Sequence, residues 1–405
     1  MSSARHFSLD ALRGFAVMGI LLMNIIGFAL PMSAYVNPMA WGHEGQADLI
    51  AWGLAFVLVD GKMRGLFSIL FGASMVLVID RADAQGASGT ALHFRRMAWL
   101  FLLGLLHFWF IWDGDILSLY ALCGMAAFLF KDMPPRPLAL LGGGLMLANL
   151  LIWASILLAA HALRADPAAQ AAYLALADAL GDPQGVSIAD DLKTFQSSYA
   201  IIADTRLASH ISSPFDLLYG YGAETLGLML WGMALFKSGA LTGQWPRRKL
   251  IRLAMAGYGL GVPASLMLAW ATARQGFETL STADIYYAFD LPARMAIMLG
   301  HLAALLLLIR LKEGKHSPLL QRVAAAGRMA FSNYILTSLV MTTLFYGYGF
   351  GLFGKASRAE IYLAVPPMWL AMLIWSPLWL NHFRYGPLEW LWRSLTKAKC
   401  QPLRR

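Results

Sequence analysis

The stretch His107–Tyr120, HFWFIWDGDILSLY, places an imidazole and two carboxylates between two long apolar runs. The first run begins after Arg96 and the second ends at Lys131. Ionisable groups beside hydrocarbon are costly, so they usually face a cavity, pair with one another or take part in function. This stretch therefore predicts two membrane helices that meet at a charged turn near the membrane surface.

The composition of the whole chain agrees with a membrane protein. Hydrophobic residues make up 59% of it and charged residues only 14%, whereas soluble chains carry about 25% charged residues. A membrane span needs about 20 mostly apolar residues, and unbroken apolar runs favour helices over barrel strands. We expect an all-α, polytopic bundle forming a single membrane domain over residues 1–405. Ten spans are predicted, at residues 14–31, 64–79, 97–112, 116–130, 138–163, 215–236, 250–273, 293–311, 329–347 and 361–381.

The distribution of Lys and Arg predicts the orientation. With the N-terminus inside, the cation-rich loops all become cytoplasmic, as the positive-inside rule requires. Both termini are then cytoplasmic, residues 164–213 form an extracytoplasmic loop, and residues 382–405 form an amphipathic tail at the inner interface. The net charge of +9 is explained by the anionic lipids of the bilayer's inner leaflet. It gives no reason to expect nucleic acid as a partner.

Residues 47–80 are too long for one span, and the polar segment Asp60–Gly65 interrupts them. We expect an interfacial or re-entrant helix on the outer side, followed by a span that begins near Arg64. Lys62 and Arg64 would then lie on the outer face, either balancing Asp113 and Asp115 or anchoring the helix at the boundary.

Neither cysteine predicts a disulfide or a metal site. Cys123 falls inside a span and Cys400 in the tail, so they are not placed to pair in an oxidising compartment. We expect no metal.

His107 is the leading candidate for chemistry. An imidazole takes and returns a proton near neutral pH, and Asp113 or Asp115 could orient it or stabilise its charged form. The alternative is a structural histidine beside an Asp-Gly turn.

Other polar residues lie within apolar runs. Arg13, near the start of the first span, is either an interfacial anchor or a ligand for an anionic group, and Asn24 follows about three turns later. Glu224 and His301 face a cavity or another helix. Asn333 and Tyr334 form a polar patch with Arg328 near the cytoplasmic side.

Six blocks of the sequence resemble the signature blocks of a known family. They are LDALRGFAVMGILLMNI, LFSILFG, HFWFIWDGDILSLYALCG, GMALFKSGAL, GRMAFSNYILTSL and GPLEWLWRSLT, which occur in order over nearly the whole chain. They look like the YeiB-like family of bacterial inner-membrane proteins. That family is similar, more distantly, to the transmembrane acyltransferases, which include the acyltransferase 3 proteins and heparan-alpha-glucosaminide N-acetyltransferase.

The resemblance implies a multi-pass protein of the bacterial inner membrane, an acyl-CoA donor on the cytoplasmic side, and an acceptor hydroxyl or amine reached from outside. The acyltransferase 3 proteins have an Arg in the first span followed by a catalytic His. Arg13 matches the Arg, but Asn24 stands at the polar position, and an amide cannot act as a general base. His107 is the best substitute, and His43 in the outer loop is the second.

The main hypothesis is thus a membrane acyltransferase with His107, Asp113 and Asp115 as its catalytic group. Acyl-CoA, the co-substrate, would bind to Arg13, Arg95, Arg96 and Arg328. A small-molecule or glycan acceptor would contact residues among Asn24, His43, Lys62, Arg64, Glu224, Asn333 and Tyr334. His107 lies nearer the outside than the donor, so a passage between the helices is required.

Two other classes of function stay open. In a proton-coupled transporter, Glu224, His301, Asp113 and Asp115 would form a proton path. In a scaffold, the chain would bind lipid or a partner protein. The sequence leaves open the acyl group, the acceptor and the oligomeric state.

Overall fold

The computed structural model describes residues 2–209, 211–312 and 317–405. These residues form helices joined by turns, and no β-strand occurs among them. The first half of the chain contains α1 (Ser2–Ala29), α2 (Ser33–Val36), α3 (Gln46–Leu58), α4 (Lys62–Ala84), α5 (Gly89–Phe110), α6 (Leu117–Ala127), α7 (Pro135–Ala165), α8 (Gln170–Ala179), α9 (Ser187–Phe195) and α10 (Tyr199–Ser209). The predicted all-α class is confirmed.

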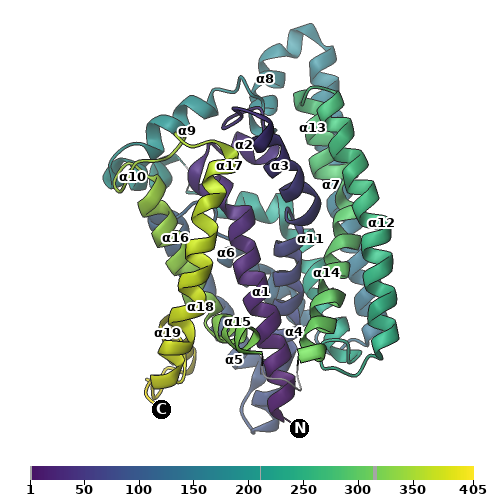
Figure 1. The fold of residues 1–405 in the computed structure, drawn as a ribbon, viewed down its shortest axis with the longest axis vertical. Helices are drawn as coiled ribbons and strands as arrows, with labels where there is room; N and C mark the ends of the chain where they lie inside the picture. Colours follow the sequence, from purple (N-terminus) through teal and green to yellow (C-terminus); the bar gives the residue numbers. More distant parts are fainter. Residues whose placement is uncertain (1, 210, 313–316) are drawn as a thin grey trace.

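The second half continues the bundle. It contains α11 (Ser213–Lys237), α12 (Arg247–Arg274), α13 (Thr279–Asp284), α14 (Leu291–Lys312), α15 (Pro318–Arg328), α16 (Ala330–Phe345), α17 (Arg358–Ile361), α18 (Val365–His382) and α19 (Pro387–Lys397). A π-helical turn at Ile285–Phe289 joins α13 to α14. In Figure 1, α1 runs through the middle of the bundle, with α12 and α14 on one side and α16 and α18 on the other.

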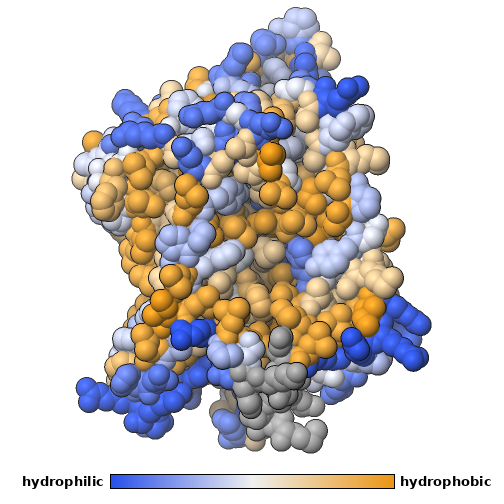
Figure 2. All heavy atoms as spheres, viewed as in Figure 1, coloured by the Kyte–Doolittle hydropathy of each residue, from blue (hydrophilic) through white to orange (hydrophobic). Residues whose placement is uncertain are grey.

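Each of the ten predicted spans overlaps a helix of the structure. Among the described residues, six stretches are long and apolar enough to cross a bilayer: residues 7–29, 46–84, 135–165, 247–274, 291–311 and 358–382. Residues 117–130 and 330–345 form shorter apolar helices. Figure 2 shows a hydrophobic band around the middle of the visible face and hydrophilic residues toward both ends. The chain thus has the helices of a membrane protein.

The stretch 46–84 is not one straight helix. As the sequence indicates, it is interrupted: α3 ends at Leu58 and α4 begins at Lys62. Gly61 makes the turn with a left-handed backbone (φ +70°), a conformation that costs any residue with a Cβ atom energy. The turn leaves Lys62 and Arg64 buried inside the bundle.

Small residues allow α4 and α11 to approach closely. A Cβ atom on Gly72 would lie 2.1 Å from the carbonyl oxygen of Met229, and one on Gly232 would lie 1.9 Å from that of Ile69. The backbones are therefore in direct contact at these two glycines, as small residues at helix interfaces allow.

Residues 164–213 are more than a connecting loop, because they contain α8, α9 and α10. The carboxylate of Asp191 accepts a hydrogen bond from the amide of Met32 (2.9 Å), and the carbonyl of Phe195 accepts one from the amide of Gly347 (2.8 Å). The helices lie at the end of the bundle opposite the two termini (Figure 1). They cover that end of the molecule.

Candidate functional site

His107 and Asp115 form a buried pair at the turn between α5 and α6. Nδ1 of His107, in the last turn of α5, lies 2.8 Å from Oδ1 of Asp115. The other carboxylate oxygen accepts hydrogen bonds from the amide (3.0 Å) and hydroxyl (3.1 Å) of Ser118. Only 1% of the His107 surface and none of the Asp115 surface is exposed. The start of α6 thus holds the carboxylate, and the carboxylate holds the imidazole.

This contact decides which nitrogen of His107 carries the proton. A carboxylate can only accept, so Nδ1 is the donor and Nε2 presents its lone pair. Nε2 is buried and has no hydrogen-bond partner. An oriented imidazole with a free Nε2 is the arrangement that a general base requires.

Asp113 does not belong to this pair. Its Oδ1 lies 3.5 Å from Nη2 of Arg206, on α10. Of the two carboxylates that the sequence offers for orienting His107, the structure brings only Asp115 to the imidazole.

A cavity of about 230 Å³ lies next to this pair, because its lining includes Ile116 and Leu117, which follow Asp115 in the chain, although His107 and Asp115 do not line it themselves. Four arginines from four helices line it: Arg13 (α1), Arg96 (α5), Arg328 (α15) and Arg393 (α19). The guanidinium of Arg13 donates to Ser74 Oγ (2.6 Å) and to Asp10 (2.8 Å). These four arginines are called the mouth of the cavity. Their positive charge favours anionic ligands such as phosphate groups.

The deeper wall of the cavity is apolar and aromatic. It includes Phe67, Phe71, Met97, Leu100, Ile116, Leu117, Tyr120 and Tyr334. The ring of Tyr334 lies between the cavity and His107, with 5.2 Å between the two ring centroids. Tyr334 thus contacts both the cavity and the candidate base.

The C-terminal tail completes the mouth. The indole of Trp392 donates to the carbonyl of Arg96 (2.9 Å), and the Arg96 guanidinium lies 4.1 Å from its ring centroid. The carboxylate of Glu389 accepts from the amides of Phe331 (2.8 Å) and Ser332 (3.1 Å) at the start of α16. Burial raises the pKa of the Glu389 carboxyl. The sequence predicts an amphipathic tail helix. It does not indicate that this helix lines a cavity, nor that Ser74 and Arg393 belong to the lining.

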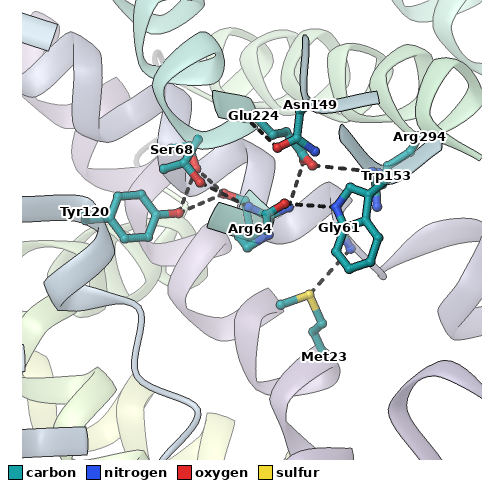
Figure 3. Close-up of polar contacts among 11 residues, drawn as sticks. Met23, Gly61, Arg64, Ser68, Tyr120, Asn149, Trp153, Glu224 and Arg294 are labelled. Carbon is teal, nitrogen blue, oxygen red and sulfur yellow. Dashed lines mark hydrogen bonds and ion pairs between the residues drawn. The ribbon is translucent and has the colours of Figure 1, made fainter. Parts of the chain in front are cut away.

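A second polar cluster lies on the other side of Tyr120. Figure 3 shows Arg64 between Tyr120 and Ser68 on one side and Glu224 on the other. Nη2 of Arg64 lies 2.8 Å from one Glu224 oxygen, and Nη2 of Arg294 lies 3.5 Å from the other. Tyr120 donates to the Arg64 carbonyl (3.2 Å), so the cluster and the cavity share a residue.

Lys62 lies in the same part of the bundle as the second polar cluster. Its ammonium lies 3.3 Å from Asp290 Oδ2, and the other oxygen of Asp290 accepts from Ser265 (2.9 Å). Lys62 and Arg64 are both buried and pair with Asp290 and Glu224, so they do not balance Asp113 or Asp115. They lie inside the bundle because Asp290, directly before α14, and Glu224, in α11, supply the carboxylates that neutralise them.

The other site residues that the sequence analysis proposes do not gather at one place. Arg95 is exposed, bonds to the carbonyl of Ala91, and is not among the residues that line the cavity. Asn24 is buried in α1, and His43 is exposed near the opposite end. Asn333 bonds to Ala326, Ser376 and Trp375, so its amide links helices.

His301 also makes helix contacts, with Tyr258 (2.8 Å) and the carbonyl of Leu58 (2.9 Å). Over residues 2–209, 211–312 and 317–405, no group of three or more His, Cys, Asp or Glu side chains is arranged to hold a metal ion.

The fold and the site define an all-helical membrane protein with a buried His–Asp pair beside a basic cavity. The chain belongs to the YeiB-like family. It is 32% identical over 405 residues to the "Uncharacterized protein YeiB" of Escherichia coli (strain K12), covering 98% of each chain. It is 31% identical over 425 residues to the "Uncharacterized protein YxaH" of Bacillus subtilis (strain 168), covering 100% of this chain and 97% of that one.

A more distant relative is the "Uncharacterized 39.9 kDa protein in amylase 3'region" of Bacillus acidopullulyticus, which is 24% identical over 98% of this chain and 95% of its own. Residues 235–399 match the family model "Protein of unknown function (DUF418)". No solved structure matches the chain.

Proposed function

We propose that the protein is an acyltransferase of the bacterial inner membrane that moves an acyl group from acyl-CoA to an acceptor hydroxyl or amine. The observation that carries the proposal is the buried His107–Asp115 pair, whose free Nε2 lies one aromatic ring away from a cavity with a basic mouth. The phosphates of CoA would bind to Arg13, Arg96 and Arg328, with the acyl end against the apolar wall. Arg393 extends this set beyond the arginines that the sequence indicates.

The reaction follows from the orientation of the imidazole. Nε2 of His107 takes the proton of the acceptor hydroxyl or amine as its oxygen or nitrogen attacks the thioester carbonyl carbon. The new C–O or C–N bond replaces the C–S bond, and CoA leaves as the thiolate. The imidazolium, stabilised by Asp115, returns the proton to the sulfur. The products are the acylated acceptor and CoA thiol.

Tyr334 would control access from the cavity to His107. Its ring packs against His107, and the same side chain lines the cavity. A rotation of this side chain would expose Nε2 to a thioester in the cavity. This supplies the passage between the helices that the position of His107 requires.

The enzymatic test uses the purified full-length protein in detergent with radiolabelled acetyl-CoA. We expect release of CoA thiol or transfer of label, reduced at least about 100-fold in His107→Ala because a general base is lost. His382→Ala, an exposed histidine near the tail, is the matched control. His43→Ala tests the second candidate base. The proposal fails if the wild type neither cleaves the thioester nor accepts label and His107→Ala behaves like the wild type in cells.

The same proposal includes ten membrane spans with both termini in the cytoplasm. Ten helices overlap the expected spans, and both termini lie at one end of the bundle (Figure 1). Cys400 is exposed and Cys123 is buried, so a membrane-impermeant maleimide reports on the tail alone. We expect Cys400 to be labelled only after spheroplasts are lysed, whereas Gln184→Cys in the 164–213 segment is labelled in intact spheroplasts. The reverse pattern would invert the orientation.

A proton-coupled transporter gains no support from the contacts. Glu224 pairs with arginines, His301 with Tyr258, Asp113 with Arg206 and Asp115 with His107. Among the described residues, these four groups thus have different partners and lie in separate clusters.

A further inference from the structure

Next to the second polar cluster lie Asp60, Arg358 and Tyr362, and together with Arg294 they are called the Asp60 cluster below. The Asp60 cluster contains buried atoms without a hydrogen-bond partner. Among the described residues, these include Oδ1 of Asp60, Nε of Arg294, Nε of Arg358 and the hydroxyl of Tyr362. Only 6% of Asp60, 7% of Arg294 and 1% of Arg358 is exposed. Each buried group left without a hydrogen bond costs about 1–3 kcal/mol. Four such groups in one region indicate a place where a ligand supplies the missing bonds.

These atoms belong to one neighbourhood. Asp60 interacts electrostatically with Arg294 and Arg358, and Tyr362 interacts with Asp60 and Arg358. Gly61, the residue after Asp60, packs directly on the Arg294 side chain, because a Cβ atom there would lie 2.2 Å from Arg294 Cδ. The turn between α3 and α4 thus brings α14 and the α17 region to the Asp60 carboxylate.

Tyr35, Tyr286 and Tyr362 are all electrostatic neighbours of Asp60, and each keeps part of its surface exposed. Their rings offer flat apolar faces, and their hydroxyls both donate and accept. A polar ligand with apolar C–H faces suits such a lining.

The charges of the cluster balance. Its cations are Lys62, Arg64, Arg294 and Arg358, and its carboxylates are Asp48, Asp60, Glu224 and Asp290. A charged ligand would upset this balance in a buried site. The unpartnered atoms include an acceptor (Asp60) and donors (Arg294 and Arg358). A neutral ligand whose neighbouring groups donate and accept satisfies both, and hydroxyls on adjacent carbons do so.

We infer that the Asp60 cluster binds a neutral polyhydroxylated molecule, held by Asp60, Arg294, Arg358 and Tyr362. This ligand would be the acyl acceptor, an assignment that rests on the proposed function. Tyr35 is an electrostatic neighbour of both Asp60 and Tyr334, so the cluster adjoins the ring that covers His107. Donor and acceptor would approach Tyr334 from opposite ends of the bundle.

Saturation-transfer NMR on the purified full-length protein, without CoA, tests the site. The probes are glucose and trehalose, with glucose 6-phosphate as an anion and choline as a cation. We expect saturation transfer to the two neutral sugars and an affinity about tenfold lower in Asp60→Asn, which corresponds to one charge-assisted hydrogen bond. Tyr362→Phe removes a single hydroxyl and should weaken binding without affecting the fold.

Two matched controls separate this effect from general disturbance. Asp132→Asn changes a carboxylate whose side chain is 85% exposed, and Tyr199→Phe removes a surface hydroxyl bonded to the carbonyl of Phe110. Both should bind sugar like the wild type. The inference is overturned if no neutral sugar receives saturation, if only choline or glucose 6-phosphate does, or if Asp60→Asn and Tyr362→Phe both bind like the wild type.

The outcomes also separate this site from the proposed reaction. Sugar binding that depends on Asp60 in a protein that does not cleave acetyl-CoA would retain the site and reject the acyl transfer. Thioester cleavage that depends on His107, without sugar binding, would retain the transfer and reject the acceptor class.

Discussion

Nδ1 of His107 lies 2.8 Å from Oδ1 of Asp115, and both side chains are buried. The carboxylate fixes the tautomer of the imidazole, and the start of α6 fixes the carboxylate. Replacing Asp115 by Asn retains the shape but removes the charge that stabilises an imidazolium. We expect Asp115→Asn to lower the rate of acyl transfer at least about 100-fold. Asp113→Asn should have a small effect, since Asp113 contacts Arg206. Equal rates in the two variants would remove Asp115 from the mechanism.

Glu224 neutralises two buried arginines, so its loss should affect folding. Glu224→Gln leaves Arg64 and Arg294 buried without a carboxylate, which we expect to cost about 3–5 kcal/mol of unfolding free energy. The matched control is Glu278→Gln, because Glu278 pairs with Arg164 near the surface and such pairs contribute about 1 kcal/mol or less. Denaturant unfolding in mixed micelles measures both. Similar losses in the two variants would contradict the buried network.

Gly61 is predicted to tolerate no side chain. Gly61→Ala places a Cβ atom 2.2 Å from Arg294 Cδ and also forces Ala into a left-handed backbone. Gly86 has nearly the same φ (+74°) but no heavy atom within 4 Å of such a Cβ. Gly86→Ala should therefore cost only the backbone term, about 1–2 kcal/mol, and Gly61→Ala more. Thermal unfolding compares them, and equal shifts would show that Arg294 moves aside freely.

Asp191 should make the attachment of α9 depend on pH. Burial raises the pKa of its carboxyl to about 7, with a further contribution from nearby Asp113, Asp178 and Asp190. A raised pKa means that the folded state favours the protonated form. The stabilisation is complete below the ordinary pKa of about 3.9 and is lost as the pH rises through about 7.

Limited proteolysis of residues 164–213 measures this effect. We expect faster cleavage at pH 8 than at pH 5.5 in the wild type, and a smaller difference in Asp191→Asn, which stays uncharged. Asp204→Asn, at an exposed carboxylate, should keep the wild-type pH dependence. A protease without pH dependence of its own in this range is required, and an unchanged profile in Asp191→Asn would contradict the assignment.

The sequence predicts the helices well because each is a long apolar run whose identity depends on local composition. It also indicates that an aspartate lies near His107, since Asp113 and Asp115 follow it after one tight turn, Asp115 being eight positions away. It does not decide between Asp113 and Asp115, because they are two residues apart and only the geometry of the turn directs one toward the imidazole.

A single sequence does not predict which polar residues pair when they are far apart along the chain. Lys62 and Asp290 are 228 positions apart, and Glu389 meets the start of α16 from 57 positions away. Hydropathy says which residues are costly to bury but not which helix neutralises them. For the same reason the sequence does not predict that the tail lines the cavity, since an amphipathic helix can pack on a lipid surface or in a protein groove.

The mouth of the cavity joins Arg13, near the beginning of the chain, to Trp392 and Arg393, near its end. During synthesis the first helices leave the ribosome well before the tail is made. The mouth of the cavity is therefore incomplete until α19 has been translated and packed against α5 and α16. A chain that ended before α19 would lack Trp392 and Arg393, so this wall of the cavity would be missing.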